Sequence, residues 1–528
     1  MLLIMSSAYI EQELKSELGK IPPSFLPLGN RRLFQHQVKL APQNVSIYLS
    51  IPDSYRISAI DEKWLSDHSV HILRIPENLS IGAALVAALN LADHSLDTPL
   101  HVLYGDTLFD SLPEGDDIIG ITEVKDSYNW AVVTNNKSQW VQNSDLGLDV
   151  DTNNVVSGYF KFSQPRQLIK CITQSSWDYI EGLNRYHSSV ALDTIRLDSW
   201  LDFGHVNTYY RSKAKFTTQR AFNQLKITSD WIEKSSDKNL KIEAEAHWFE
   251  TLPKKLRGYI PQYLGTTNNE NRVSYKLEYL YHTALNELFV FSETSSSAWK
   301  QIIFGCLKFL EDCYKVKKPQ SEPANTLEEL FGKKTNERID DFCSDNGISR
   351  KQIWQFNNEL TVSIDEVLTL SNSYLPKKQF DLSVLHGDFC FSNILYDFRT
   401  GRVKTIDPRG ITPENQLSIY GDIRYDLAKL SHSILGMYDW IIAGYYDVSI
   451  ESDSINFRIE SSQKHRQIQK IFSDLVLEKF GISILNLYAM QIQLFLSMLP
   501  LHSDDPQRQK ALFANVFRLY QILQRLEK

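Results

Sequence analysis

The feature that most constrains the fold of this 528-residue chain is one short stretch, residues 385–407. It begins with the sequence LHGDFC, reaches Asn393 and continues into two apolar runs, residues 393–396 and 402–406, on either side of a turn. Short apolar runs that flank a glycine-containing turn predict two strands paired as a hairpin. Such a hairpin would bring Asp407, which follows the second run, back beside Asn393.

The polar residues of this stretch have the spacing of a phosphoryl-transfer site. His386, Asp388 and Asn393 follow the pattern H-x-D-x-x-x-x-N, as in the protein-kinase catalytic loop, where the Asp accepts the proton of the attacking hydroxyl and the Asn holds magnesium. Asp407 corresponds to the Asp of the kinase D-F-G element. Because magnesium is a hard cation that is usually held by one or two carboxylates with phosphates and water, Asn393 and Asp407 are the predicted metal ligands and Asp388 the predicted base. Alternatively, HGD is an ordinary turn and Asn393 and Asp407 cap strand ends, which suits each residue singly but not their joint spacing.

This stretch resembles the aminoglycoside phosphotransferase and choline kinase superfamily, whose motif has HGD in place of HRD. Residues 422–430 are similar to the D-x-A helix of that family, which gives Asp426 the structural role of bracing the catalytic loop. The resemblance implies an α+β, protein-kinase-like, two-lobed domain over residues 216–528. Its N-lobe would span about 216–285 and its C-lobe about 286–528.

The resemblance also implies ATP as the phosphate donor. Residues 241–249 are similar to the family's helix C, in which Glu245 is the better match and Glu243 the second choice. Such a Glu pairs with a strand lysine that contacts the nucleotide phosphates, and Lys234, at the end of a predicted hairpin over residues 225–234, is the candidate. The competing lysines nearby are Lys226, Lys238 and Lys241. Lys234, Glu245 and His386 are the expected cofactor-binding residues, and residues 275–280 resemble the hinge strand.

The N-terminal block alternates between strand-like and helix-like segments. Apolar runs at 45–49, 70–73 and 100–104 alternate with helical patterns such as residues 81–89, which predicts a mostly parallel, doubly wound α/β sheet. Ligands bind at the carboxyl ends of strands in such sheets. Asp106 directly follows one of these strands and is placed to hold a metal.

Four segments of this block, residues 25–33, 103–106, 157–162 and 200–204, resemble the sugar-phosphate nucleotidyltransferases. The resemblance implies a nucleotidyltransferase-like domain over residues 1–215, in which Asp106 and Asp202 hold magnesium and CTP or UTP is the nucleotide. Two features depart from that family. Residues 6–10 replace its glycine-rich turn, and Pro23 stands in place of its lysine, so a positive charge for the triphosphate is missing unless Arg31 or Arg32 supplies it. The alternative is therefore a domain that keeps this fold but only binds a ligand.

Composition narrows the classes of partner. A net charge of -8 and a pI near 5.9, without a long basic run, give no attraction for nucleic acid. The five cysteines are scattered without C-x-x-C pairs, so neither a zinc site nor a disulfide framework is indicated and a cytoplasmic location is expected. The sequence is expected to contain no apolar run of about 18 residues, and therefore no membrane span. Residues 209–216 are polar and predict a short, stiff connection between the domains, and homo-oligomer formation is left open.

The sequence thus predicts an ATP-dependent small-molecule kinase that phosphorylates a hydroxyl of a small alcohol, sugar or amino-acid-like substrate. By resemblance the candidates are choline, ethanolamine, glycerol-like polyols, sugars or an amino acid. If both domains work, the product would be coupled to a nucleotide for surface-polysaccharide or lipid-headgroup synthesis. The alternatives are a kinase regulated by a non-catalytic nucleotide-sugar sensor, an assembly scaffold without activity, and an antibiotic-modifying enzyme.

Overall fold

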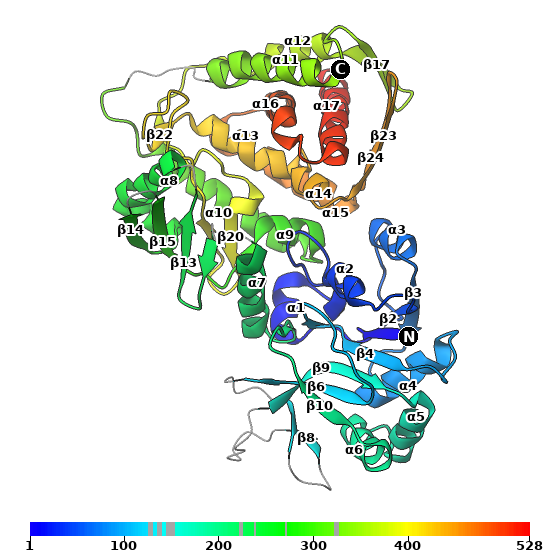
Figure 1. Ribbon diagram of the computed structural model, residues 1–528. Coiled ribbons are helices and arrows are strands. Elements are labelled where there is room, and N and C mark those ends of the chain that lie inside the picture. Colours follow the sequence, from blue (N-terminus) through cyan, green and yellow to red (C-terminus); the bar gives the residue numbers. More distant parts are fainter. Residues whose placement is uncertain are drawn as a thin grey trace. The chain divides into compact units, whose positions relative to one another are not determined.

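The computed structural model describes residues 1–124, 130–134, 140–143, 154–220, 225–236, 239–269, 272–321 and 327–528 (Figure 1). The chain divides into two compact units, Met1–Thr217 and Thr218–Lys528.

The first unit is built on a sheet in which the strand order is β10-β6-β9-β4-β1-β2-β3. These strands are β1 (Leu2–Met5), β2 (Ile47–Pro52), β3 (Val70–Ile75), β4 (Leu100–Tyr104), β6 (Ile118–Glu123), β9 (Asn154–Phe162) and β10 (Asp193–Arg196). β7 (Ala131–Val133) and β8 (Val141–Asn143) extend the sheet beside β9, and β5 (Thr107–Leu108) pairs with β11 (Leu201–Asp202). β1 runs parallel to β2 and β4, and β2 runs parallel to β3, whereas β9 is antiparallel to β4 and β6. The predicted α/β sheet is confirmed, but it is mixed: β4-β1-β2-β3 form a parallel part, and the pairs that β9 makes are antiparallel.

Helices pack on this sheet and close its core. They are α1 (Gln12–Leu18), α2 (Leu33–Gln37), α3 (Ala59–Asp67), α4 (Ile81–Leu91), α5 (Pro165–Gln174), α6 (Tyr179–Val190) and α7 (Val206–Arg220), with the short 3-10 turns η1 (Pro23–Phe25) and η2 (Val38–Leu40). Leu85 of α4, Leu168 of α5 and Leu183 of α6 form one buried cluster with Val102 and Phe160 of the sheet. Each such side chain contributes roughly 1.5–3 kcal/mol when it leaves water. This layer fixes the strand ends from which the polar residues of the unit emerge.

The expected connection at residues 209–216 is part of helix α7. Val206, Tyr210 and Ala214 recur every four residues, so they lie on one face of the helix, and all three are buried. Tyr209 and Phe216 are buried beside them. The segment predicted as a short, stiff connection is thus helical, and the charged residues between these positions conceal the helical period in the sequence.

The N-terminal part of the second unit is a four-stranded sheet in the order β12-β13-β15-β14. It consists of β12 (Leu225–Ile227), β13 (Trp231–Ser235), β14 (Tyr263–Asn269) and β15 (Arg272–Glu278), with helix α8 (Asn239–Thr251) and η3 (Lys254–Tyr259). The predicted hairpin is confirmed, with Leu225 opposite Lys234. The helix predicted at residues 241–249 is α8, which packs against β14 and β15.

The remainder of the second unit is mainly helical. Its helices are α9 (Leu285–Phe291), α10 (Ser296–Tyr314), the π-helix η4 (Glu328–Lys333), α11 (Lys334–Asn346), α12 (Ile364–Ser373), α13 (Ile423–Ile434), α14 (Tyr438–Ile442), α15 (Gln463–Phe480), α16 (Ile484–Met498), η6 (Leu499–His502) and α17 (Pro506–Glu527). Three small sheets join them: β16 (Thr283–Ala284) with β20 (Ile394–Asp397) and β21 (Arg402–Thr405); β18 (Leu360–Ser363), β17 (Ile353–Phe356), β24 (Ser454–Ile459) and β23 (Tyr446–Glu451); and β19 (Ser383–Val384) with β22 (Tyr420–Gly421). The predicted hairpin after the HGD sequence is β20–β21, with Ile394 opposite Thr405.

One helical segment corrects an expectation about apolar runs. Within the described ranges, Ile484–His502 is long and apolar enough to cross a membrane, although no such run was expected. In this structure 67% of its most apolar window is buried, and Leu487, Ile492 and Phe495 are fully enclosed. The segment therefore serves as a core helix of the second unit.

Candidate functional site

Helix α13 braces the HGD turn of the second unit. The helix begins where the Asp422 carboxylate accepts the backbone N–H of Arg424 at 3.0 Å. One turn on, Asp426 accepts the backbone N–H groups of His386 at 2.7 Å and Gly387 at 2.8 Å. Burial raises the pKa of Asp426 to about 7, against the effect of these two hydrogen bonds. The contacts fit the bracing role expected for Asp426.

The backbone around the turn leaves no room for larger side chains. Gly387 has a φ of 82°, and a Cβ there would come within 2.6 Å of the Arg409 Cβ. Gly410 has a φ of 63°, and a Cβ there would come within 1.9 Å of the Ala244 carbonyl oxygen on α8. Only glycine tolerates both the left-handed conformation and the close approach. Helix α8 is further tied to the turn by Trp248, whose Nε1 donates to the Leu385 carbonyl at 2.7 Å.

Asp388 lies between an ammonium and an amide. Its Oδ1 is 2.9 Å from Lys429 Nζ, and its Oδ2 accepts from Asn393 Nδ2 at 3.1 Å. Partial burial alone would raise the pKa of Asp388, but the charge of Lys429 outweighs it and holds the pKa below its usual range. Asp388 is therefore a carboxylate at neutral pH, available to accept a proton.

Sequence reasoning did not single out Lys429. It lies on α13 three residues after Asp426, within the helix that the resemblance used only for bracing. The signal that could have found it is the helical period: Tyr425 and Lys429 are four residues apart and share a face. Because Asp426 is tied to the HGD turn, that face is also close to Asp388.

The structure brings Lys234, Glu245 and Asp407 together. Lys234 Nζ is 2.8 Å from Glu245 Oε2 and 3.0 Å from Asp407 Oδ1. Burial opposes a charge on Lys234, but Asp407 and Glu245 together raise its pKa. Tyr275 of β15 donates to Glu245 Oε2 at 2.7 Å and fixes that carboxylate. The group has the strand-lysine and helix-glutamate geometry that the sequence led us to expect.

The competing residues lie elsewhere. Lys226 is exposed and sits 5.5 Å from the centre of the Trp231 ring. Lys241 approaches Glu245 only to 3.7 Å, with 64% of its side chain exposed. Glu243 is exposed on the outer face of α8, and Lys238 is outside the described residues. Lys234 and Glu245 are therefore the pair that this geometry favours.

Asn393 and Asp407 have oxygens suited to magnesium. The backbone N–H of Ile406 donates to the Asn393 carbonyl at 3.0 Å, which ties the two ends of the hairpin together. Asp407 adopts a left-handed φ of 55° that turns it out of the strand. Asn393 uses its Nδ2 for Asp388, so its Oδ1 remains a potential ligand. Among the described residues no group of three or more His, Cys, Asp or Glu gathers as a metal site, and an amide with one carboxylate fits an ion that takes its other ligands from phosphate and water.

His386 does not have the cofactor-binding role that was expected. Its side chain is fully buried, and its Nε2 lies 3.0 Å from the Ile406 carbonyl oxygen. Burial lowers its pKa to about 4, so the imidazole is neutral. His386 therefore holds the turn against the segment that leads to Asp407 and presents no surface to a nucleotide.

In the first unit, Asp106 and Asp202 meet as expected, although they are far apart in the chain. Asp202 lies opposite Thr107 in the β11–β5 pair. A Cβ on Gly204 would come within 2.9 Å of Asp106 Oδ2 and 3.3 Å of Asp202 Oδ1, which places both carboxylates around that glycine. Burial, and then the charge of Asp202, raise the pKa of Asp106 to about 7. Asp202 Oδ2 is buried without a hydrogen-bond partner among the described atoms. Two crowded carboxylates with an unsatisfied oxygen fit a divalent cation.

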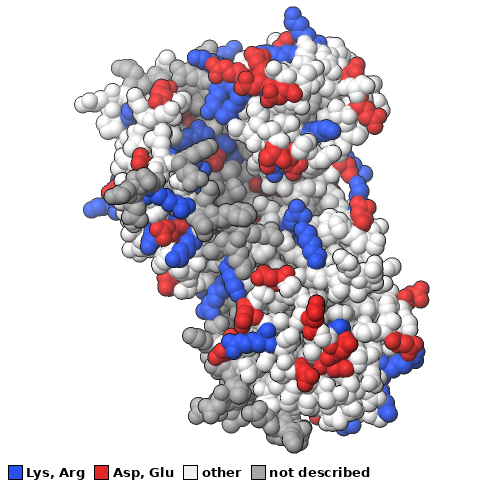
Figure 2. Space-filling view, in the orientation of Figure 1, with Lys and Arg blue, Asp and Glu red and all other residues white. Residues whose placement is uncertain are grey.

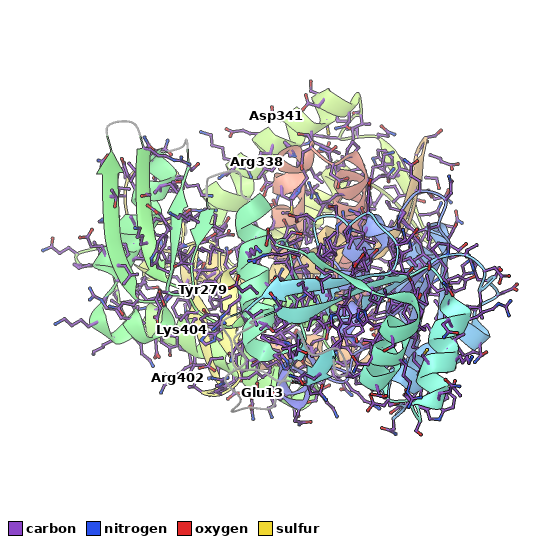
Figure 3. All side chains as sticks on the ribbon, turned by 60° about the horizontal axis from the view of Figure 1, so that its bottom comes forward. Glu13, Tyr279, Arg338, Asp341, Arg402 and Lys404 are labelled. Atoms are coloured by element: carbon purple, nitrogen blue, oxygen red, sulfur yellow. The ribbon has the colours of Figure 1, made fainter. Side chains whose placement is uncertain are left out.

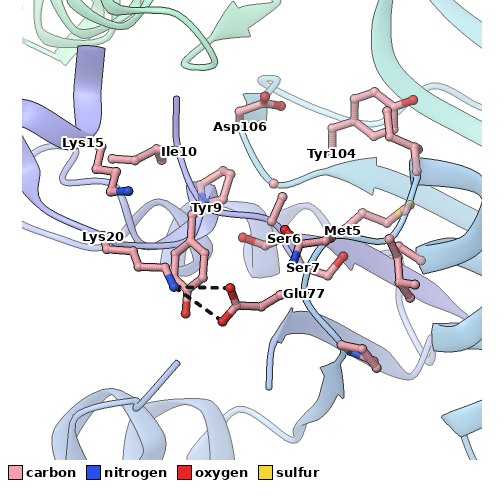
Figure 4. Close-up of a pocket in the computed structure, with 18 of the residues that line it drawn as sticks. Met5, Ser6, Ser7, Tyr9, Ile10, Lys15, Lys20, Glu77, Tyr104 and Asp106 are labelled. Atoms are coloured by element: carbon pink, nitrogen blue, oxygen red, sulfur yellow. Dashed lines mark hydrogen bonds and ion pairs between the residues drawn. The ribbon is translucent and has the colours of Figure 1, made fainter. Parts of the chain in front are cut away.

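Asp106 borders two cavities, of about 540 Å³ and about 670 Å³. Figure 4 shows the smaller one, with Lys15 and Lys20 on one side and Tyr104 on the other. Ser6 and Ser7, which replace the glycine-rich turn, line it as well. Lys20 Nζ is 3.3 Å from Glu77 Oε2.

The positive charge that Pro23 lacks is found on lysines of the cavity wall and not on Arg31 or Arg32, which were the expected substitutes. Arg32 cannot supply it, because its Nε pairs with Asp61 at 3.3 Å and its Nη1 donates to the Phe25 carbonyl at 2.9 Å in the interior. Arg31 is exposed and does not line either cavity. Lys15 and Lys20 are the lysines on the cavity wall, and sequence reasoning missed them because they lie in and just after helix α1, away from the aligned position of Pro23.

Known proteins resemble this chain in fold. No family model matches it, and no curated protein matches it significantly. Among solved structures it is similar to a nucleoside-diphosphate-sugar pyrophosphorylase from Vibrio cholerae, with 12% identity over 40% of this chain and 99% of that chain and a TM-score of 0.33. It is also similar to the inositol-1-phosphate CTP transferase from T. maritima, with 15% identity over 41% of this chain and 95% of that chain and a TM-score of 0.31. A third similar structure is aminoglycoside phosphotransferase APH(3'')-Id from Streptomyces rimosus, solved with ADP and streptomycin, with 14% identity over 58% of this chain and 97% of that chain and a TM-score of 0.28.

All three identities are 15% or less, and all three TM-scores are below 0.5. The activities of these proteins are therefore not transferred to this chain by the comparison.

Proposed function

We propose that the second unit is an ATP-dependent kinase that transfers a phosphoryl group to a hydroxyl of a small molecule. The observation that carries this proposal is a pair of side-chain groups: Asp388 held by Lys429 and Asn393, and Lys234 held by Glu245 and Asp407. The first group has a carboxylate that can accept a proton. The second has a lysine for phosphate oxygens and a carboxylate suited to magnesium.

In the proposed reaction the substrate hydroxyl attacks the γ-phosphorus of ATP. A new oxygen–phosphorus bond forms, the bond to the leaving ADP oxygen breaks, and the hydroxyl proton passes to the Asp388 carboxylate. Asp388 orients the hydroxyl through Oδ1 or Oδ2, and Asn393 fixes the carboxylate by its hydrogen bond at 3.1 Å. Since the charge on the transferred group spreads over its oxygens, positioning and nearby positive charge account for most of the rate.

Lys429 is assigned the positive charge beside that transferred group. Its ammonium is 18% exposed and already lies 2.9 Å from Asp388, so it can contact both the carboxylate and an incoming phosphoryl oxygen. Burial opposes its charge, but Asp388 raises its pKa. Magnesium, held by Asn393 and Asp407, would shield the phosphate oxygens of the nucleotide.

The test is ADP release from ATP and magnesium with a panel of alcohols, sugars, hydroxy acids and amino acids. Substrate-dependent ADP release is expected from the wild type, and Asp388→Asn should lower it roughly 100-fold to 10,000-fold, as for loss of a general base. Asp453→Asn makes the same substitution at an exposed aspartate. It is the matched control and should keep full activity. Equal rates for the wild type and Asp388→Asn would refute the assignment.

A second activity is supported by the first unit. The crowded pair Asp106 and Asp202 would hold a divalent cation, and Lys15 and Lys20 lie along the adjoining cavity wall, where a nucleoside triphosphate would bring negative charge. The unit would couple the phosphorylated product to CTP or UTP with release of pyrophosphate, giving an activated building block for a surface polysaccharide or lipid headgroup in the cytoplasm. Pyrophosphate that appears only when phosphorylated product and nucleotide are both present would support this step. Tight nucleotide-sugar binding without pyrophosphate would instead make the unit a sensor.

A further inference from the structure

Four cationic side chains, Lys334, Arg338, Arg409 and Lys429, lie close enough to Tyr425 to interact with it electrostatically, and Lys429 also pairs with Asp388. The Arg409 guanidinium lies over the Tyr425 ring, 5.0 Å from its centre, and donates to the Tyr425 hydroxyl at 3.1 Å. Lys429 is one helical turn from Tyr425 on α13. This ring is therefore the centre around which the positive charges collect.

Helix α11 contributes the other two charges. The Phe331 ring, just before α11, packs 5.9 Å from the Tyr425 ring, which sets the start of this helix against the same region. Lys334 and Arg338 are four residues apart on one face of α11, and both are half-buried. Figure 3 labels Arg338 on this helix, and Figure 2 shows Lys and Arg side chains gathered in the upper half of that view, over the region that α13 occupies in Figure 1.

Among the described residues, Asp388 and Asp426 do not balance the four positive charges of this cluster. Asp388 is paired with Lys429, and Asp426 spends both oxygens on backbone N–H groups. In the described contacts, Arg338 donates to the Ser497 carbonyl and Arg409 to a tyrosine hydroxyl, and neither they nor Lys334 forms an ion pair with a carboxylate. Burial, followed by the charges of Arg338 and Arg409, lowers the pKa of Lys334. Half-buried cations that repel one another are costly unless an anion joins them.

We propose that the phosphate acceptor is itself an anion: a small hydroxyl compound with a carboxylate or phosphate group that Lys334, Arg338 and Arg409 bind while its hydroxyl faces Asp388. This inference rests on the proposed kinase function, because Asp388 defines where the hydroxyl lies. Arginine suits both anionic groups, since its planar fork matches their paired oxygens. A cationic acceptor such as choline, ethanolamine or an aminoglycoside would be repelled by the same positive charges.

The first experiment tests the anion site without turnover. Inorganic phosphate is titrated into the full chain saturated with magnesium and a non-hydrolysable ATP analogue, so that the nucleotide site is already filled. Binding is expected, and the double variant Lys334→Met, Arg338→Gln should weaken it at least about tenfold, as for loss of charged hydrogen bonds. The control Lys300→Met, Lys351→Met removes the same charge from exposed positions and should leave the affinity unchanged. Equal affinity in all three proteins, or no binding once the nucleotide site is filled, would overturn the proposal.

The second experiment compares small hydroxyl-bearing acceptors of different charge: neutral glycerol, anionic glycerate and glycerol phosphate, and cationic choline. ADP release should be faster with glycerate or glycerol phosphate, and which of the two is faster separates a carboxylate acceptor from a phosphate acceptor. Faster release with glycerol or choline would overturn the anionic acceptor while the kinase function stands. Phosphate binding that depends on Lys334 and Arg338, with no ADP release from any acceptor, would support the anion site and contradict the proposed kinase.

Discussion

At the scale of single residues, Lys429 carries the clearest consequence for catalysis. Lys429 has the largest effect among the groups that lower the pKa of Asp388, so loss of its ammonium should raise that pKa. We expect Lys429→Met to lower the rate of ADP release by roughly 100-fold, as for loss of one charge-stabilising group. The acid limb of the pH–rate profile should also move to higher pH, because the base is active only when ionised.

The sign of this shift follows from linkage. Asp388 has a lowered pKa in the folded wild type, so its ion pair adds stability above the unfolded pKa and loses it as pH falls through the folded pKa. The variant lacks this contribution and should unfold more easily at neutral pH, whereas Lys429→Arg should retain both the stability and the position of the acid limb. An unchanged acid limb in Lys429→Met would show that Lys429 does not set the ionisation of Asp388.

Lys234 and Lys226 offer a matched comparison within one hairpin. Lys234 contacts Glu245 and Asp407, whereas Lys226 is exposed above Trp231. Lys234→Met should lower kcat/KM for ATP by roughly 10-fold to 100-fold, since it removes a charged contact to phosphate. Lys226→Met should change kcat/KM by less than about twofold. A larger effect from Lys226 than from Lys234 would move the phosphate-binding role to Lys226.

At the scale of elements, helix α13 contains a buried histidine whose protonation opposes folding. His432 stacks on Phe495 and Tyr438, with ring centres 4.6 Å and 4.3 Å apart, and its Nδ1 has no hydrogen-bond partner in the described structure. Burial keeps its pKa well below the ordinary value, so the unfolded chain takes up the proton first as pH falls. Phenylalanine has a similar ring and takes up no proton.

His432→Phe should therefore gain stability relative to the wild type as pH falls below about 6.5, by about 1.4 kcal/mol per pH unit. Denaturant unfolding of both proteins at about pH 7.5 and about pH 5.5 measures this difference. His68→Phe, a change at an exposed histidine, is the control and should show a smaller pH-dependent difference. A constant difference between His432→Phe and the wild type at both pH values would contradict the buried, neutral histidine.

The elements that could be predicted from the sequence are those with a local period or a local turn. The hairpins β12–β13 and β20–β21 were predicted because strand-like residues and turn residues lie within a few positions of one another, and helix α8 was predicted from the resemblance of its short local segment to a family helix. Helix α7 was missed because lysines and arginines interrupt its apolar face. Residues 157–162 of strand β9 were singled out, but its antiparallel direction was not predicted, because strand direction depends on the path of the whole sheet and not on its own residues.

The site residues also divide into those that a local sequence pattern predicts and those that it does not. Asp388, Asn393 and Asp407 follow one another within a fixed local spacing, so the motif was sufficient to find them. Lys429 is separated from Asp388 by about forty residues, and Lys334 by more than fifty, and their positions depend on how α13 and α11 pack. Such residues are brought together only by tertiary structure, which a single sequence does not display.

At the scale of the whole molecule, the chain has two units with separate candidate sites, Asp106 with Asp202 and Asp388 with Lys429. If the two activities are chemically separate steps, each variant should remove one of them. Asp388→Asn should abolish substrate-dependent ADP release but retain pyrophosphate release when phosphorylated product is supplied with CTP or UTP. Asp202→Asn should do the reverse, because it removes a buried carboxylate that has an unsatisfied oxygen and would bind the cation. Both products are followed in the same full-length proteins, with wild type as the reference. Pyrophosphate absent from every protein would leave the first unit as a sensor, whereas loss of ADP release in Asp202→Asn would show that the two sites do not act independently.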